Sequence, residues 1–221
     1  ELHTHSPSLR RLTPAELVQR APCLRLEALG GCLAESGAAD IDVNGLHQGY
    51  LHGLRKQGGT VRMNAEVTAL TRENGLWTVQ LQDGSSVQAR TVVNAAGAWA
   101  DEVGALFGAP AIGLVPHRRS AFTFRAPEGV DASGWPAVVG VDESYYFKPD
   151  AGMLFGSPAN ADPTHAQDVQ PEELDIATGA YHIEEATTLH VRPAHTWAGL
   201  RSFVADGDLV GGYATDTEGF F

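Results

Sequence analysis

TVVNAAGAWA, residues 91–100, is the stretch on which the interpretation of the fold depends. The β-branched Val92 and Val93 lead an apolar run that is too short for a helix, which predicts a strand buried on both faces. The small residues that follow let the backbone approach another group closely, and Gly97 can adopt a positive φ at little cost. A helix is expected over residues 99–107, because Asp101 and Glu102 suit the positive end of a helix dipole.

A strand, a turn of small residues and a helix N-terminus together present backbone N–H groups to a phosphate-bearing ligand. An ordinary strand-to-helix turn explains the same ten residues equally well. The sequence contains no GxGxxG fingerprint, no Walker loop and no GxSxG nucleophile motif. The stretch alone therefore leaves both interpretations open.

The composition is that of an ordinary globular protein, with 221 residues, 43% apolar and 19% charged. A net charge of −12 argues against nucleic-acid binding, which requires a cationic surface. No apolar run reaches about 18 residues, which predicts no membrane span, and no signal peptide is recognisable. We therefore expect a cytoplasmic protein. The polar start and the two terminal aromatic residues suggest a piece of a longer chain.

Local signals place the elements of the first half. Thr13-Pro14-Ala15-Glu16 predicts a helix start, and Asp42 is expected to cap a helix that Gly58-Gly59 ends. Asn74-Gly75 and Asp83-Gly84 predict two tight turns in a three-stranded antiparallel meander. Further strands are expected within residues 29–36 and at 61–63, 67–70 and 92–93.

The second half is expected to form an antiparallel sheet with one helix. Alternation predicts strands at residues 121–124, 138–141, 145–147, 153–155, 197–204 and 209–213. A helix is predicted from Pro171 towards Thr188, and a tight turn at Asp206-Gly207-Asp208. We place the boundary between the halves so that the domains are residues 1–108 and 109–221.

Metal binding is not predicted. The pairs His3 and His5, and His47 and His52, lack the spacing of a zinc helix, and Cys23 and Cys32 are expected to be buried and inert.

Three groups of polar residues are candidates for ligand binding. Arg201 lies in an apolar strand, where it either forms an ion pair with Asp206 or Asp208 or clamps a substrate carboxylate. Arg118-Arg119 is either an anion site or a solvated strand edge. Tyr145 and Tyr146 must point to opposite faces of their strand, so one of them can present its hydroxyl to a ligand.

Taken together, these segments resemble the D-amino-acid oxidase superfamily of FAD-dependent oxidoreductases, which includes glycine oxidase and sarcosine oxidase. The resemblance runs from Leu12 onward and is carried by Gly58-Gly59-Thr60-Val61, Ala65-Glu66-Val67, residues 91–99, Tyr145-Tyr146-Phe147-Lys148-Pro149 and Trp197-Ala198-Gly199-Leu200-Arg201. It implies an α/β and α+β fold: a partial FAD-binding domain of the glutathione-reductase type with a β-meander, joined to an antiparallel-sheet substrate domain.

The resemblance also implies roles for individual residues. Val67 would meet the adenine of FAD, and Ala96, Gly97 and Trp99 would lie near its diphosphate and ribose. Arg201 would clamp the substrate carboxylate, and Tyr145 or Tyr146 would line the site. The family's N-terminal and C-terminal Gly-rich segments are not found in the sequence, so we expect this chain alone to carry no stoichiometric FAD and to have little activity.

The reaction implied for the intact protein is oxidation of an amine carbon of an amino acid or N-alkyl amino acid, with hydride transfer to flavin. One alternative is a 2-hydroxy-acid dehydrogenase, in which His117 would be the base. The other is a non-catalytic β-sheet binding module. The partner expected is a small amino-acid or hydroxy-acid substrate, and the oligomeric state is left open.

Overall fold

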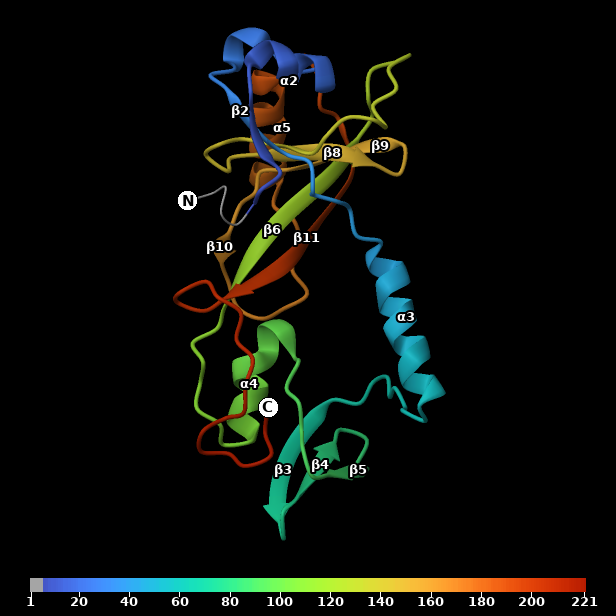
Figure 1. The fold of residues 1–221 in the computed structure, drawn as a ribbon. Coiled ribbons are helices and arrows are strands. Elements are labelled where there is room, and N and C mark those ends of the chain that lie inside the picture. The colour runs from blue at the N-terminus through green and yellow to red at the C-terminus, as the bar shows by residue number, and fades with distance from the viewer. Residues whose placement is uncertain (1–5) are drawn as a thin grey trace. The chain divides into compact units, whose positions relative to one another are not determined.

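The computed structural model describes residues 6–221, which form two compact units. Unit 1 comprises residues 6–11 and 33–92, and unit 2 comprises residues 12–32 and 93–221 (Figure 1). The pair His3 and His5 lies outside the described residues. The predicted domains, residues 1–108 and 109–221, were defined by what each half binds. The two units are defined by backbone packing, so they do not test that division, which stays a prediction.

Unit 1 contains a two-stranded sheet, a three-stranded antiparallel sheet and one long helix. Its elements are β1 (Leu9–Leu12), β2 (Cys32–Glu35), α3 (Val43–Lys56), β3 (Val67–Glu73), β4 (Leu76–Leu81) and β5 (Ser86–Ala89). Strands β1 and β2 pair with each other, and β3, β4 and β5 form the predicted meander in that order. Trp77 and Leu81 of β4 are its buried residues.

The local signals in unit 1 are confirmed. Asp42 caps α3 by accepting a hydrogen bond from the Gly45 N–H at 2.8 Å. Asn74 and Gly75 have φ values of 52° and 78°, as a two-residue hairpin requires, and Gly84 has a φ of 80° in the second turn.

Three predicted strands are wrong. Residues 61–63, 92–93 and 209–213 form no ladder with another strand among residues 6–221. Val93 is 63% exposed and Leu209 is fully exposed, so neither belongs to a buried strand. A strand forms only where a neighbour satisfies its backbone groups, and alternation of side chains does not reveal whether that neighbour exists.

Unit 2 is built on one antiparallel sheet backed by a helix. Its elements are α2 (Pro14–Arg20), η1 (Leu26–Ala28), η2 (Gly97–Trp99), α4 (Ala100–Leu106), β6 (Val115–Phe124), β7 (Val138–Val139), β8 (Tyr146–Asp150), β9 (Met153–Ser157), β10 (Asp162–Pro163), α5 (Glu173–Ala186) and β11 (Pro193–Phe203). Helix α2 begins with the predicted capping box, in which Thr13 and Glu16 satisfy each other's backbone N–H groups.

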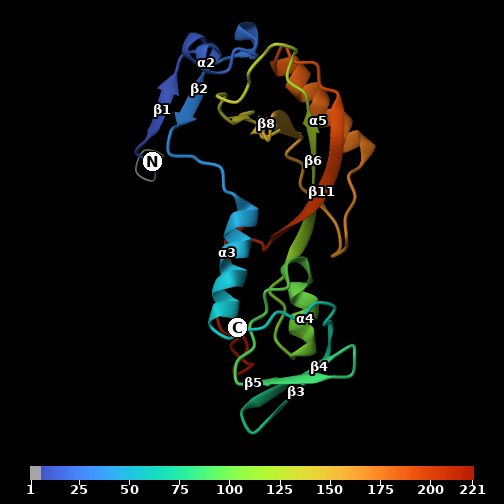
Figure 2. The ribbon, with the colours of Figure 1, turned by 90° about the vertical axis from the view of Figure 1, so that its right-hand side faces the viewer.

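Strand β6 is the centre of this sheet (Figures 1 and 2). Strand β11 pairs with β6 from Val115 to Phe124, along one edge. The other edge of β6 pairs with β9 and β10, and β9 continues through β8 to β7. All of these pairings are antiparallel, as expected for the second half of the chain.

The side chains of β6 alternate between two faces of the sheet. Phe122 and Phe124 point to the inner face, where they are fully buried with Phe147, Leu154 and Ile183 of β8, β9 and α5. Helix α5 comes close to this face because Gly179 has no side chain: a Cβ there would lie 2.9 Å from the Phe122 ring. The opposite side chains of β6 are therefore directed away from α5.

Candidate functional site

The outer face of the sheet, which points away from α5, carries most of the candidate residues. On β6 it consists of the odd-numbered residues, and the register pairs these with odd-numbered residues of β11. The pairs are Ala121 with Trp197, Arg119 with Gly199, and His117 with Arg201. Directly opposed residues of an antiparallel pair project to the same face, so the register alone brings Arg201 and His117 together.

An aromatic row crosses the outer face. Tyr146 stacks on Phe155 with ring centroids 5.5 Å apart, and Phe155 meets Trp197 edge-on, also at 5.5 Å. Phe155 belongs to β9 and Trp197 to β11, with β6 between them. The two rings can meet because Ala121, on β6, has a side chain too small to separate them.

Phe203, at the C-terminal end of β11, contacts both Arg201 and His117. The guanidinium carbon of Arg201 is 5.4 Å from the centroid of the Phe203 ring, within cation–π distance. The imidazole of His117 packs edge-on against the same ring at 5.1 Å. Phe203 therefore contacts both residues that are predicted to meet substrate.

The position of the proton on His117 follows from its hydrogen bond. Its Nδ1 is 2.8 Å from the carbonyl oxygen of Ala161. A carbonyl only accepts, so Nδ1 must donate, and in the neutral imidazole Nε2 carries the free lone pair. His117 is thus prepared to accept a proton or a hydrogen bond at Nε2.

Arg201 is exposed, and it has no carboxylate partner among the described residues. The alternative of an ion pair with Asp206 or Asp208 is not realised: Asp206 instead accepts a hydrogen bond from the Asp208 N–H at 3.0 Å. Its charge is therefore available to a ligand.

The adjacent arginines Arg118 and Arg119 have different roles. Arg118 points to the inner face, where Asp175, Glu172 and Asp162 surround its guanidinium; the Asp175 contact is 2.9 Å. This arginine joins β6 to α5 and is not an anion site. Arg119 points to the outer face and donates from Nε to the Asn160 carbonyl at 3.0 Å.

The two tyrosines also separate. Tyr145 packs against the hydrophobic core and stacks on Phe147, and burial, followed by the nearby Asp142 carboxylate, raises the pKa of its hydroxyl. Tyr146 takes part in the aromatic row of the outer face. Of this pair, Tyr146 therefore shares a face with Arg201 and Tyr145 does not.

Gly97 and the helix after it match the prediction for the candidate cofactor turn, whereas the buried strand predicted before the turn does not form. Gly97 has a φ of 58°, and the Asn94 side chain fixes the turn by accepting from the Ala96 N–H and donating to the Ala100 carbonyl. Helix η2, which contains Gly97 and Trp99, packs against β11. Ala96, Gly97 and Trp99 thus lie beside the strand that carries Arg201. Val67 belongs to unit 1, and its role stays a prediction.

Asp101 has a structural role at this turn. Its carboxylate accepts hydrogen bonds from the N–H groups of Ile112 and Leu114, both at 2.9 Å. It thereby ties α4 to the segment that leads into β6. The terminal segment returns to the same region, where the Asn94 N–H donates to the Phe221 carbonyl at 2.7 Å.

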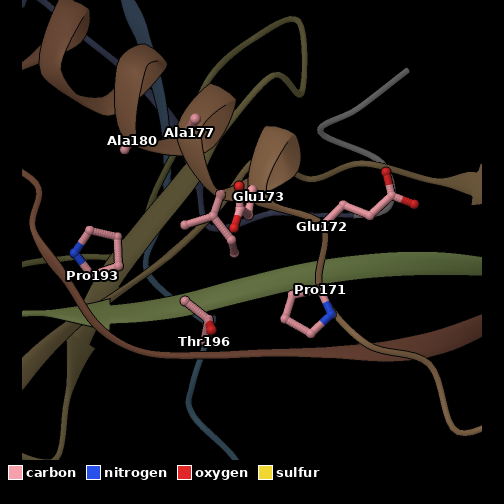
Figure 3. Close-up of a pocket in the computed structure, with 8 residues that line it drawn as sticks. Pro171, Glu172, Glu173, Ala177, Ala180, Pro193 and Thr196 are labelled. Atoms are coloured by element: carbon pink, nitrogen blue, oxygen red, sulfur yellow. The ribbon is translucent and has the colours of Figure 1, made fainter.

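A groove of about 350 Å³ lies on the side of the sheet that faces α5 (Figure 3). It is lined by apolar atoms of Ile176, Pro193 and neighbouring residues, with Glu172 and Glu173 among its lining residues. Carboxylates at this position would repel an anionic substrate. The groove is thus separate from the outer face and lacks the charge that a carboxylate ligand requires.

Trp197, Phe155 and Phe203 were not predicted as site residues. Trp197 and Phe203 stand four residues before and two residues after Arg201 on the same strand, which is the spacing of one strand face. That signal was present in the sequence, whereas the contact of Phe155 with Trp197 depends on the order of the strands.

Among residues 6–221, no group of three or more His, Cys, Asp or Glu side chains is arranged to hold a metal ion. The helices in this part of the chain are all too short or too polar to cross a membrane.

Comparison with curated proteins finds mitochondrial dimethylglycine dehydrogenases. The Mus musculus protein is 31% identical over 156 residues, covering 69% of this chain and 18% of that protein. The Homo sapiens protein is 29% identical over 168 residues, covering 74% and 19%. The chain thus spans about a fifth of the length of these relatives.

Solved structures share the fold. Glycine oxidase from Geobacillus kaustophilus superposes with a TM-score of 0.81 at 21% identity, covering all of this chain and 60% of that one. Iminodiacetate oxidase from Chelativorans sp. BNC1 gives a TM-score of 0.79 at 23% identity, covering 100% and 58%. A model of the DAO family, described as FAD dependent oxidoreductase, matches residues 1–221. The resemblance seen in the sequence is confirmed: the chain belongs to this family of FAD-dependent oxidoreductases.

Proposed function

We propose that the protein containing this chain oxidises an amine carbon of an amino acid or N-alkyl amino acid, and that Arg201 binds the substrate carboxylate. The observation that carries the proposal is an arginine for which residues 6–221 provide no carboxylate partner, on a strand against which the candidate cofactor turn packs. A small amino-acid or hydroxy-acid substrate and a cytoplasmic location are part of the proposal.

The residues of the turn fit a dinucleotide. Ala95, Ala96 and Ala98 have small side chains, and the space in which a Gly97 side chain would stand is open to 4 Å. A diphosphate can therefore approach this backbone closely. FAD, when bound, supplies the hydride acceptor. The role of the turn is to seat the cofactor beside β11.

Arg201 suits a carboxylate because its planar guanidinium donates two parallel hydrogen bonds, which fix the orientation of the ligand as well as its position. Phe203 supports the guanidinium from one side. The aromatic row with Tyr146 and Trp197 supplies an apolar wall along the same face. Positioning of this kind is what hydride transfer requires from a protein.

Oxidation of a 2-hydroxy acid is the second candidate, and one observation favours it. His117 lies directly opposite Arg201, and its Nε2 is unprotonated when the ring is neutral. A substrate hydroxyl beside a carboxylate held at Arg201 would then have a base on the facing strand. Amine oxidation does not require this base once the amine is neutral.

The test uses the full-length flavoprotein, mixed without oxygen with amino acids, N-methyl amino acids or 2-hydroxy acids, while flavin reduction is followed by absorbance. Arg201→Gln should weaken the binding of carboxylate substrates by about 10- to 100-fold, since each charge-assisted hydrogen bond contributes ~1.5–3 kcal/mol. Arg125→Gln is the matched control, because it removes the same charge at a distance from the site. Arg125 comes directly after the end of β6, six residues and therefore about 20 Å of extended chain from Arg119.

The variants separate the candidates. His117→Gln should leave amine oxidation nearly unchanged and should abolish oxidation of hydroxy acids if these are the substrates. A non-catalytic module would give a different result: none of the substrates would reduce the flavin of the wild type, and Arg201→Gln would bind carboxylates as well as the Arg125→Gln control does.

A further inference from the structure

Two arginines share the outer face at neighbouring register positions. Gly199 is paired with Arg119, and Arg201 is paired with His117. Arg119 and Arg201 are thus diagonal neighbours, whose backbones lie about 7–8 Å apart and whose long side chains can reach the same ligand. Both are directed away from α5.

Within the part of the chain that the structure describes, neither of these arginines is paired with a carboxylate. Among residues 6–221, Arg119 has the Asn160 carbonyl as its hydrogen-bond partner, through Nε alone, and Arg201 has the Phe203 ring. The outer-face residues of β6 and β11 within these strands include no Asp or Glu. The chain does neutralise Arg118, with three carboxylates on the inner face. Two neighbouring positive charges for which residues 6–221 provide no carboxylate partner would attract an anion.

The space directly over Gly199 is open. Gly199 lies opposite Arg119 and two residues from Arg201, and a side chain added at Gly199 would meet no atom within 4 Å. A ligand can therefore lie over Gly199 with one end at each guanidinium.

We propose that Arg119 is a second anion-binding residue of this site, and that the substrate is an amino acid with two carboxylates, one held by Arg201 and the other by Arg119. The inference rests on the proposed function, because it takes Arg201 as the first clamp. It adds the substrate class: an aminodicarboxylic acid or an N-carboxyalkyl amino acid.

The test compares glutarate with pentanoate, which have the same chain length and two carboxylates or one. Dissociation constants are measured on the full-length holoenzyme from the perturbation of the flavin absorbance. The wild type should bind glutarate about 10- to 100-fold more tightly than pentanoate, the contribution of one charge-assisted clamp. Arg119→Gln should reduce this ratio to within about twofold and leave pentanoate binding nearly unchanged.

Arg119→Lys keeps the charge and should retain part of the preference, and Arg125→Gln, which removes the same charge elsewhere, should retain all of it. Equal binding of the two acids by the wild type, or an unchanged ratio in Arg119→Gln, overturns the inference while the role of Arg201 stands. Pentanoate binding that Arg201→Gln does not weaken refutes the proposed function itself. If Arg119→Gln does not fold, the wild-type ratio and Arg119→Lys still decide.

Discussion

Replacing Gly179 with alanine should destabilise unit 2 by about 2 kcal/mol. The new Cβ would lie 2.9 Å from the Phe122 ring and 2.9 Å from both the backbone nitrogen and Cδ of Pro158, against ordinary contacts of about 3.5–4.0 Å. Because a ring in the core and a proline backbone cannot easily move, we take the upper end of the range for overpacking, ~3 kcal/mol. Alanine in a helix interior returns about 1 kcal/mol of that cost.

Gly104→Ala is the matched control, since it makes the same change inside a helix of the same unit. Its new Cβ would lie 3.8 Å from the Asn94 amide nitrogen and 4.0 Å from the Ala109 Cβ, which are ordinary contacts. The gain in helix propensity should then appear in full, and Gly104→Ala should stabilise the unit by ~0.5–1 kcal/mol.

Urea unfolding followed by tryptophan fluorescence measures both variants, with circular dichroism as a second probe of the same transition. In thermal unfolding, the expected cost for Gly179→Ala corresponds to a fall in melting temperature of about 4–8 °C. If Gly179→Ala is as stable as the unmodified chain, α5 does not pack on Phe122 at the distance described.

Asp175→Ala should cost ~3 kcal/mol in urea unfolding, because it leaves the Arg118 guanidinium on the inner face without its 2.9 Å partner; a loss below ~1 kcal/mol would show that the remaining acids suffice. Burial raises the pKa of the Cys23 thiol from 9.0 to about 12, so its contribution to stability is present below pH 9 and is lost as the pH rises towards 12. The free energy of unfolding should therefore fall over that interval by more in the native sequence than in Cys23→Ala, and identical pH profiles would contradict the assignment. Phe203→Leu should weaken pentanoate binding at Arg201 by about two- to fivefold, the contribution of an exposed cation–π contact, whereas Phe203→Tyr should not; equal losses in both would mean that the ring only fills space.

Local chemistry in the sequence predicted local structure correctly. The caps at Thr13 and Asp42 and the turns at Asn74-Gly75 and Asp83-Gly84 each depend on residues within four positions of one another. These caps and turns are stabilised by interactions within the same short segment, so they can be predicted without knowing which distant residues pack against them.

The strands predicted at 61–63, 92–93 and 209–213 had no such local basis. Alternating or apolar residues allow an extended segment, but the ladder that would hold it involves residues far away in the sequence. The same limit applied to the candidate site. The pairing of β8 with β9 decides which of Tyr145 and Tyr146 shares the face of Arg201. The sequence shows that the two side chains point to opposite faces, but not which of them points to which face.

Alternate residues of strand β6 face opposite sides of the sheet, and this affects which positions can vary among relatives of this protein. Positions 118, 120, 122 and 124 contact α5 and the core, so their replacement endangers folding. Positions 117 and 119 project to the outer face, which is the proposed ligand side, and their side chains lie outside that core. If the outer face binds substrate as proposed, substitutions at every second residue of this one strand can change substrate choice, whereas a shift of the β6 pairing register by one residue would exchange the two sets at once.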